Sequence, residues 1–351
     1  MKNIIFICQA VDKNDSILAS SIGLIREFAL QSEIEKVTVL TLRQGDFTLP
    51  ENVQVYTIKE KTKLATIIKF YKKIFKHILQ TDYYFIYMGG HYPLLLLPIK
   101  LLFGKSIYQW KAHPKISLSM RFYAYFCDTK IFTSVSKAFP LKLTKVKVVG
   151  QGVDIDQFDI NDAISKTEDL ISVGRISQIK HIEKSLIALA TCNQLYNTHY
   201  RLNIYGPIFD KNQDYKHRLD QLVTELNLSQ LVKFRGAVSQ EQLPAILNQH
   251  QLMISFNGGA LDRSVVEAMA CGLPVITPNQ CMAEVLPKQY DFLIISEDHV
   301  GQHAEAIHQL MSLSKEESFD LGQGLRSVIK ENHSLKSLVA KIIKEINNHE
   351  T

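Results

Sequence analysis

Short apolar runs and longer stretches with a helical period alternate along the whole chain. In the front half the apolar runs predict seven strands, at residues 3–8, 36–42, 53–58, 83–88, 105–111, 129–134 and 146–150. Helical patterns lie between several of them, at residues 16–31, 62–80, 92–103, 116–126 and 136–143. Strands that are apolar on both faces and separated by helices are typical of a parallel sheet.

The same alternation restarts in the back half. Strands are predicted there at residues 170–173, 200–205, 231–234, 251–256, 273–277 and 292–295. Helices are predicted at residues 180–192, 213–227, 240–249, 262–271, 299–312, 316–330 and 334–347. Two such series predict an α/β protein with two doubly wound parallel-sheet domains.

A polar segment between the two series sets the expected domain limits. Residues 154–169 carry five Asp and one Glu and show little periodicity, which indicates a linker. We therefore expect a first domain over residues 1–158 and a second over residues 159–333. The remaining segment, 334–351, is expected to form a helix that packs back across the domain boundary.

The two halves of the chain carry opposite net charge. Residues 1–160 hold 22 Lys/Arg and 13 Asp/Glu, a net charge of +9, whereas residues 161–351 hold 18 and 22, a net charge of −4. This asymmetry predicts different partners for the two halves. The total of +5 is too small for a dedicated nucleic-acid binder, and we expect no nucleic-acid partner.

Cysteine usage and hydropathy exclude further classes of protein. The five cysteines stand far apart without a Cys-x-x-Cys pair, so we expect free thiols in the reducing cytoplasm and no zinc site. The most apolar stretch, residues 93–103, is 11 residues long. A bilayer needs about 20 apolar residues for a spanning helix, so this stretch is too short to cross one.

Two basic residues follow the first predicted strand of the second domain. That strand ends at Gly174, Arg175 comes next, and Lys180 stands five residues further on. Parallel sheets bind ligands beyond the carboxyl ends of their strands, where an Arg fork and a Lys point charge can hold a diphosphate. The alternative is a pair of solvated surface cations.

Residues 255–277 predict a strand, a glycine-rich loop, a helix, a glycine stop and a second strand. Gly258 and Gly259 permit close approach of the backbone to a ligand. The helix start near Asp262 offers backbone amides to an anion. Glu267, one to two turns into the helix, is placed to accept hydrogen bonds from a ribose diol. The alternative is a solvent-facing glutamate on an ordinary helix.

These segments carry a resemblance to a known family. Val173-Gly174-Arg175 with Lys180 is similar to a donor-phosphate motif, and the segment 267–275, EAMACGLPV, is similar to the most specific motif of the same family. The segments 232–244 and 152–158 match further signatures. Over nearly its whole length the chain resembles glycosyltransferase family 4, retaining sugar-nucleotide-dependent enzymes of the GT-B fold.

The resemblance implies two Rossmann-like domains facing a cleft, with the acceptor in the first domain and the donor in the second. It implies a transferase that moves a sugar from a nucleoside-diphosphate sugar to a glycan or lipid-linked acceptor, with retention and without a metal or cofactor. Synthesis of cell-envelope polysaccharide or glycolipid is the expected setting. Two alternatives stay open: a sugar-nucleotide epimerase on the same scaffold, and a non-catalytic nucleotide-sugar-binding subunit of a transferase complex.

The resemblance also assigns roles to residues. Arg175 and Lys180 would hold the diphosphate and stabilise its leaving-group charge, with His113 of the first domain near the transferred sugar. Glu267 would bind the ribose. The other expected donor contacts are Gly174, the base-framing Ala237 and Val238, and the backbone of Gly258, Gly259, Ala260 and Leu261 around the sugar.

The chain departs from the family pattern at two places. Gly259 stands where the family often has a glutamate, eight positions before Glu267. The loop after the first strand reads Val11-Asp12-Lys13-Asn14-Asp15, where many members carry a Gly-Gly pair. Both departures bear on the sugar and the acceptor rather than on the nucleotide.

The predicted helix 62–80 is amphipathic and basic. Its apolar positions recur at helical spacing, and Lys69, Lys72, Lys73 and Lys76 fall together on another face. One interpretation is a core-packed helix with a solvated lysine face. The other is a surface that docks on anionic lipid, which would make the protein cytoplasmic and peripheral on the inner face of the plasma membrane.

Overall fold

The computed structural model describes residues 1–15, 18–167, 169–296 and 298–350, and the chain divides into two compact units. Unit 1 comprises Met1–Gly152 and the segment from Leu335 onward, and unit 2 comprises Val153–Ser334. The chain thus leaves unit 1 and enters unit 2 between residues 152 and 153, and not after residue 158 as expected. The reason is that Val153 forms a parallel bridge with Ser334, and Arg326 donates a hydrogen bond to the Phe158 carbonyl at 2.6 Å.

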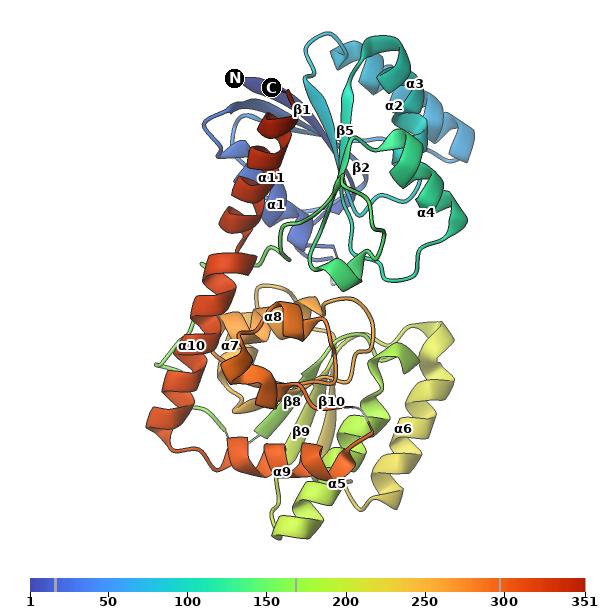
Figure 1. Cartoon of the computed structure of the whole chain (residues 1–351). Coiled ribbons are helices and arrows are strands. Elements are labelled where there is room, and N and C mark those ends of the chain that lie inside the picture. Colours follow the sequence, from blue (N-terminus) through green and yellow to red (C-terminus); the bar gives the residue numbers. More distant parts are fainter. Residues whose placement is uncertain (16–17, 168, 297, 351) are drawn as a thin grey trace. The chain divides into compact units, whose positions relative to one another are not determined.

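Unit 1 is built on a seven-stranded, all-parallel sheet of order β3-β2-β1-β4-β5-β6-β7 (Figure 1). The strands are β1 Lys2–Val11, β2 Ile34–Gln44, β3 Val53–Thr57, β4 Tyr83–Tyr87, β5 Ser106–Trp110, β6 Lys130–Thr133 and β7 Val146–Val148. The helices are α1 Ser20–Ala29, α2 Lys63–His77, α3 Tyr92–Phe103, α4 Leu118–Phe122 with a π-helical turn at Tyr123–Cys127, and α11 Leu335–Glu350. All seven strands predicted for the front half are present.

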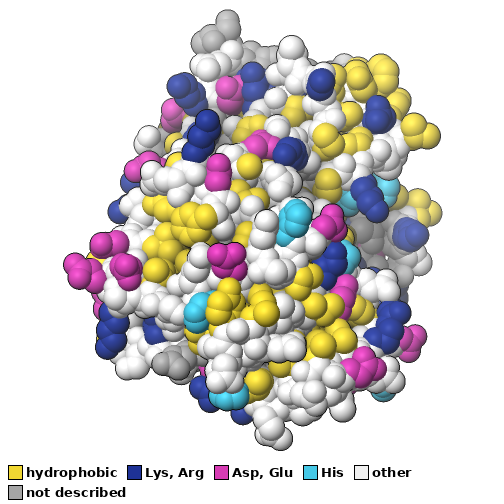
Figure 2. Space-filling view, turned by 60° about the horizontal axis from the view of Figure 1, so that its bottom comes forward, with side chains coloured by type: hydrophobic (Ala, Val, Ile, Leu, Met, Phe, Trp, Pro, Cys, Tyr) yellow, Lys and Arg dark blue, Asp and Glu magenta, His cyan; other side chains and the backbone are white. Residues whose placement is uncertain are grey.

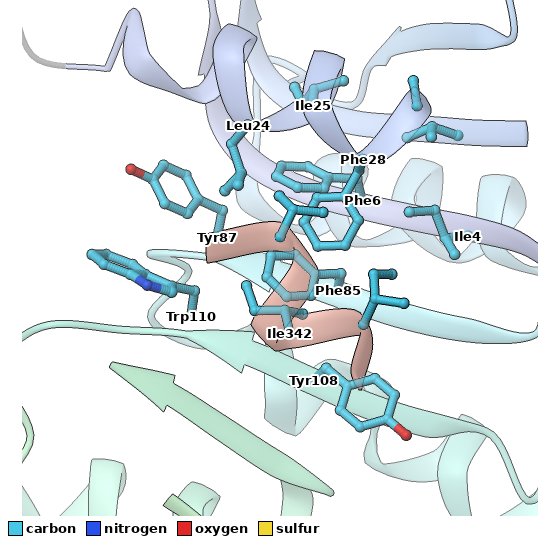
Figure 3. Packing of buried hydrophobic residues seen from close by; sticks show 14 of the residues in the cluster. Ile4, Phe6, Leu24, Ile25, Phe28, Phe85, Tyr87, Tyr108, Trp110 and Ile342 are labelled. Carbon is cyan, nitrogen blue, oxygen red and sulfur yellow. The ribbon is translucent and has the colours of Figure 1, made fainter. Parts of the chain in front are cut away.

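Successive residues of β1 point to opposite faces of this sheet, and each face has its own core. Ile4 and Phe6 pack with α1 and α11, whereas Ile5 and Ile7 pack with α2 and α3. Figure 3 shows Phe6, Phe28 and Phe85 gathered with Ile342 of α11 in the first of these cores. The last helix therefore lies beside α1 (Figure 1) and supplies apolar side chains to the core of unit 1.

Unit 2 has a five-stranded parallel sheet of order β10-β9-β8-β11-β12. The strands are β8 Asp169–Val173, β9 Arg201–Tyr205, β10 Val232–Gly236, β11 Leu252–Ile254 and β12 Val275–Ile276. The helices are α5 Ile182–Tyr196, α6 Gln213–Glu225, α7 Leu243–Asn248, α8 Arg263–Ala270, α9 Val300–Met311 and α10 Lys315–His333. The strand order reverses between β8 and β11, which is where doubly wound sheets hold their ligands.

Three predicted elements differ from the structure. The helix expected at 136–143 is wrong, because Pro140 limits it to a single 3₁₀ turn at Ser136–Ala138. The strand expected at 292–295 is wrong, because that segment follows a 3₁₀ helix and forms one isolated bridge between Ile294 and Thr277. In the helix expected at 16–31, α1 begins at Ser20, and residues 16 and 17 lie outside the described residues.

No helix within the described parts of the chain is both long and apolar enough to cross a membrane. All five cysteines are free and buried.

Candidate functional site

The loops that follow β8 and β11 meet at the reversal point of the unit 2 sheet. Lys180, in the loop after β8, donates a hydrogen bond from its Nζ to Oδ2 of Asp262 in the loop after β11, at 2.5 Å. Ser264 Oγ donates to the carbonyl of Val173 at 3.1 Å. These contacts tie the predicted phosphate-binding loop to the start of α8.

The pair of Lys180 and Asp262 is largely buried. Their side chains are 15% and 9% exposed, so Lys180 is not a solvated surface cation. Burial alone would raise the pKa of Asp262, but the Lys180 ammonium and hydrogen bonds from Lys180 and Ser264 outweigh it and hold that pKa below its ordinary value. Asp262 also caps α8 through the backbone N–H of Ser264.

Two glycines shape the loop that carries Lys180. Gly174 and Gly206, which follow β8 and β9, have φ values of 145° and 155°. A Cβ on Gly206 would lie 1.8 Å from the Gly174 carbonyl oxygen, and a Cβ on Gly174 would lie 2.7 Å from Cε of Lys180. Glycine is therefore required at both positions for this loop to turn back over the sheet. Gly206 is a site residue that was not predicted from the sequence.

Glu267 is the second polar centre of the site. Its side chain is 4% exposed, which rules out the solvent-facing alternative. Burial raises its pKa, although Arg263 and two hydrogen bonds oppose the rise. Arg263 Nε and Gln240 Nε2 each donate to Oε1 at 2.7 Å. Neither bond uses Oε2, which can still accept hydrogen bonds from a diol.

Arg263, Gln240 and Asp262 are site residues whose roles sequence reasoning missed. The spacing of Arg263 and Glu267 is that of neighbours on a helix surface, and this signal was available in the sequence. The contact of Gln240 with Glu267 brings the loop after β10, which contains Ala237 and Val238, to α8. Ala237 is exposed and Val238 half-buried.

The backbone of the glycine-rich loop lies open on one side. A Cβ on Gly258 would meet nothing within 4 Å, and a Cβ on Gly259 would meet only the Asn257 side chain, at 3.3 Å. Neither glycine has a positive φ. The described chain therefore does not itself require glycine at residue 258, and the space beside the loop is available to a ligand. Ala260 and Leu261 continue this loop to α8, and Leu261 is buried.

Apart from Ala237 and Val238, the predicted residues of unit 2 thus fall into two groups. Gly174, Lys180, the loop 258–261 and Glu267 are joined by the contacts above. Arg175 is exposed and lies directly after Gly174, in the same loop after β8 as Lys180.

His113 belongs to unit 1, three residues beyond the carboxyl end of β5. Its side chain is exposed, and Nδ1 donates to the Lys115 carbonyl at 2.7 Å. In the neutral ring this leaves Nε2 as an acceptor. The same strand end also carries Gln109, which donates to the Gly89 carbonyl at 2.6 Å, and Lys111, a buried lysine whose pKa is lowered by burial.

A cavity of about 380 Å³ lies at the other edge of the unit 1 sheet, where β5 begins. It is lined by Lys100, Lys105, Lys145 and Asp128 among others. Asp128 is 1% exposed, and neither of its carboxyl oxygens has a hydrogen-bond partner among the described residues. Burial raises the pKa of Asp128 to about 7 in spite of the neighbouring Lys145, Lys100 and Lys111. None of the predicted site residues lies at this edge.

Among the described residues, no group of three or more His, Cys, Asp or Glu side chains is arranged to hold a metal ion.

Comparison with known proteins places these features in a family. The model of the family described as glycosyl transferases group 1 matches residues 154–328. A GDP-mannose:cellobiosyl-diphosphopolyprenol alpha-mannosyltransferase of Xanthomonas oryzae is 24% identical over 204 residues, which are 58% of this chain and 52% of that protein. An uncharacterized glycosyltransferase of Methanocaldococcus jannaschii is 26% identical over 188 residues, 49% of this chain and 48% of that protein. The match spans about half the length of these curated relatives.

Solved structures share the fold over the whole chain. Anabaena HepE in complex with UDP and glucose has a TM-score of 0.79 at 16% identity, covering 99% of this chain and 100% of that one. A TarM variant of S. aureus in complex with fondaparinux, alpha-GlcNAc-glycerol and UDP has a TM-score of 0.76 at 11% identity, covering 98% and 99%. The fold is GT-B, as predicted, with one parallel α/β sheet in each unit.

Proposed function

Since the chain belongs to the glycosyl transferases group 1, we propose that it transfers a sugar from a nucleoside-diphosphate sugar to a glycan or lipid-linked acceptor. One observation carries this proposal. At the reversal point of the unit 2 sheet, Lys180 meets Asp262 at the start of α8, and the buried Glu267 lies on that same helix. A cation, helix amides and a carboxylate able to accept hydrogen bonds from a diol thus lie at one end of the unit 2 sheet, which supports a nucleotide-sugar site there.

The diphosphate would lie between the loop after β8 and the start of α8. Lys180 has three N–H donors and uses one on Asp262, so two are left for phosphate oxygens. Arg175 would add a planar fork, and the amides at the start of α8 would add the positive end of the helix dipole. These groups stabilise charge that grows on the leaving diphosphate, which is electrostatic catalysis.

The rest of the donor would follow the same path. Glu267 would accept hydrogen bonds from the ribose through Oε2, while Arg263 and Gln240 hold its other oxygen. The base would lie against the backbone at Ala237 and Val238. The open side of Gly258 and Gly259 leaves room for the sugar. His113 of unit 1 would contact the transferred sugar through Nε2.

We propose that the transfer retains the anomeric configuration and needs no metal. Arg175 and Lys180 supply the charge that a divalent ion supplies in other transferases. Activity should therefore survive a chelator. Loss of activity with the chelator, and recovery with magnesium or manganese, would contradict this part of the proposal.

The acceptor is proposed to be lipid-linked and to be met at the inner face of the plasma membrane, in envelope polysaccharide or glycolipid synthesis. The name of the Xanthomonas relative includes a diphosphopolyprenol acceptor. The lysines of α2 supply positive charge for an anionic lipid surface.

The deciding experiment measures donor use by the full chain. Nucleoside diphosphates are first screened by thermal shift, and the matching nucleotide sugar is then incubated with and without acceptors. Ligand at about 100 times its dissociation constant should add roughly 2.7 kcal/mol to stability. We expect donor consumption that needs an acceptor. Conversion of the donor without an acceptor would support an epimerase, and binding without conversion would support a non-catalytic subunit. The absence of any shift at millimolar nucleotide would refute the donor site itself.

A further inference from the structure

The cavity at the starting edge of the unit 1 sheet gathers positive charge. It has a volume of about 380 Å³ and lies where β5 and β6 begin, at the end of the sheet opposite His113. This volume is within the range of small-molecule pockets, about 300–1,000 Å³. Three lysines and Asp128 line the cavity, which gives a net charge of +2 when the aspartate is ionised. On the face shown in Figure 2, by contrast, basic and acidic side chains are interspersed.

Backbone carbonyls hold two of the ammonium groups in place at this cavity. Lys100 Nζ donates to the Cys127 carbonyl at 2.9 Å. Lys145 Nζ donates to the carbonyls of Tyr125 at 2.9 Å and of Asp128 at 3.1 Å. An ammonium group has three N–H donors, so two remain on Lys100 and one on Lys145. Burial lowers the pKa of both groups, and Lys100 lowers that of Lys145 further, as expected where negative charge is scarce.

Lys105 and Thr129 add further donors to the lining. Lys105 is half-buried and forms no hydrogen bond or ion pair with any residue that the structure describes. Thr129 Oγ1 accepts a hydrogen bond from the Ile107 backbone N–H at 2.9 Å, which leaves its O–H to donate. Three ammonium groups exclude a metal cation from this place. They suit an oxyanion of the phosphate type, whose oxygens accept charge-assisted hydrogen bonds from several donors at once.

Asp128 is a buried carboxyl group in the wall of this cavity. It is 1% exposed, and neither carboxyl oxygen has a hydrogen-bond partner among the described residues. The charged and titratable groups that face it come from four elements: Lys100 of α3, Lys111 after β5, Cys127 of the π-helical turn and Lys145 before β7. Burial outweighs the lysines and raises the pKa of Asp128 to about 7. The charge at the cavity therefore changes between pH 6 and pH 8.

We propose that this cavity binds a phosphate-type oxyanion, carried by a small soluble molecule, and that Asp128 takes up a proton from solvent as the anion binds. The lysines and the Thr129 hydroxyl donate to the anion. An ionised Asp128 repels the anion and offsets the lysines, whereas the neutral acid leaves the full lysine charge to the ligand. Asp128 thus acts through its charge and needs no contact with the ligand. The site is separate from the proposed donor site and goes beyond the proposed transfer reaction.

The test is titration calorimetry of the full chain with sodium sulfate, without nucleotide and at an ionic strength held constant with chloride. Sulfate keeps the same charge between pH 6 and pH 8, so a change in its affinity comes from the protein. Lys105→Gln removes one cavity ammonium, and Lys61→Gln, at an exposed position of the same unit, is the matched control. Asp128→Asn removes the titrating group. Arg175→Ala controls for sulfate bound at the proposed donor site.

We expect the parent to bind sulfate about fivefold to tenfold more weakly at pH 8 than at pH 6, because Asp128 is mostly neutral at pH 6 and mostly ionised at pH 8. Asp128→Asn should bind equally at both pH values. Lys105→Gln should weaken binding at pH 6 about tenfold, whereas Lys61→Gln and Arg175→Ala should keep it. In two buffers of different ionisation enthalpy, the heats at pH 8 should show proton uptake by the parent and none by Asp128→Asn.

Several results would overturn the proposal. No sulfate binding at millimolar concentration, or binding that is lost in Arg175→Ala and kept in Lys105→Gln, would leave the cavity without an anion. Equal losses in Lys105→Gln and Lys61→Gln would reduce the effect to overall charge. Parental affinity that is the same at pH 6 and pH 8 would remove the role of Asp128. Melting temperatures check that the variants fold, and Lys145→Gln, a second cavity variant, should repeat the loss seen with Lys105→Gln.

Discussion

The buried pair of Lys180 and Asp262 can be perturbed one partner at a time. Asp262→Asn keeps the size and the capping oxygen of the side chain and removes its negative charge. Lys180→Met keeps an unbranched apolar stem and removes the positive charge. Each single variant leaves a charge in a site where the partners are 15% and 9% exposed. Breaking a buried pair in this way costs about 3–5 kcal/mol, and the partial exposure of Lys180 favours the lower end.

The double variant isolates the interaction. It contains neither charge, so its loss of stability should be smaller than the sum of the single losses, with a coupling energy of about 1–3 kcal/mol. Urea unfolding of the full chain at pH 7 measures all four proteins, with one transition fitted for each unit, since a two-unit chain need not unfold in a single step. Strict additivity of the two substitutions would refute the pairing.

The pH dependence gives a second check on the same pair. Because the pKa of Asp262 is lower in the folded state than its ordinary value of 3.8, the pair stabilises the fold fully above that value. This stabilisation is lost as the pH falls through the folded-state pKa. The difference in stability between the parent and Asp262→Asn should therefore be constant near neutral pH and should shrink in acid. A difference that grows in acid would contradict the assigned charge of Asp262.

Three further predictions concern single residues. Arg175→Ala should lower turnover at saturating donor about 10²–10³-fold while changing the donor dissociation constant much less, and parental turnover would show that Arg175 is not catalytic. Glu267→Ala should weaken donor binding by roughly 1.5–3 kcal/mol, seen in titration calorimetry, with turnover at saturation nearly kept; unchanged affinity would remove Glu267 from the ribose site. Asp128 has a pKa of about 7 against an ordinary 3.8, so its ionisation alone should lower the stability of the parent by about 4 kcal/mol between pH 4 and pH 8. Asp128→Asn should lack this loss and be more stable than the parent at pH 8 in urea unfolding, whereas parallel pH profiles would contradict the raised pKa.

The strands of both units could be predicted because their residues are apolar on both faces. Apolar runs such as residues 3–8 and 83–88 are typical of central strands in a sheet whose two faces are both covered by helices. The helix predicted at 136–143 failed because Pro140 limits it to a short 3₁₀ turn. The strand predicted at 292–295 failed because this run forms only one isolated bridge, at Ile294. On α2 the helical period was predicted, but spacing alone does not tell which apolar side chains reach the core: Phe70 and Ile74 are buried there, whereas Leu64 and Phe75 are exposed.

The candidate site was predicted in part, for a physical reason. Loops after parallel strands share one edge of the sheet, so Gly174, Lys180 and the loop at 258–261 could be assigned to the same edge from sequence. Which loops touch depends on strand order, and that is set by pairing between segments far apart in the chain. The adjacency of β8 and β11 therefore makes Asp262 the partner of Lys180, a relation that no local pattern contains.

The contacts of the site also bear on Gly259, a position at which the family resemblance leads us to expect a glutamate. Lys180 is paired with Asp262, and Arg263 with Glu267, so these two cations are each offset by a carboxylate. Arg175 is then the one predicted site cation within the described residues without such an offset, and it leaves the site with an excess of one positive charge. A carboxylate at residue 259 would cancel that excess beside the place proposed for the sugar and diphosphate. With glycine there, the charge of a departing diphosphate can be met by Arg175 and the amides of α8, so the departure is compatible with the proposed electrostatic catalysis.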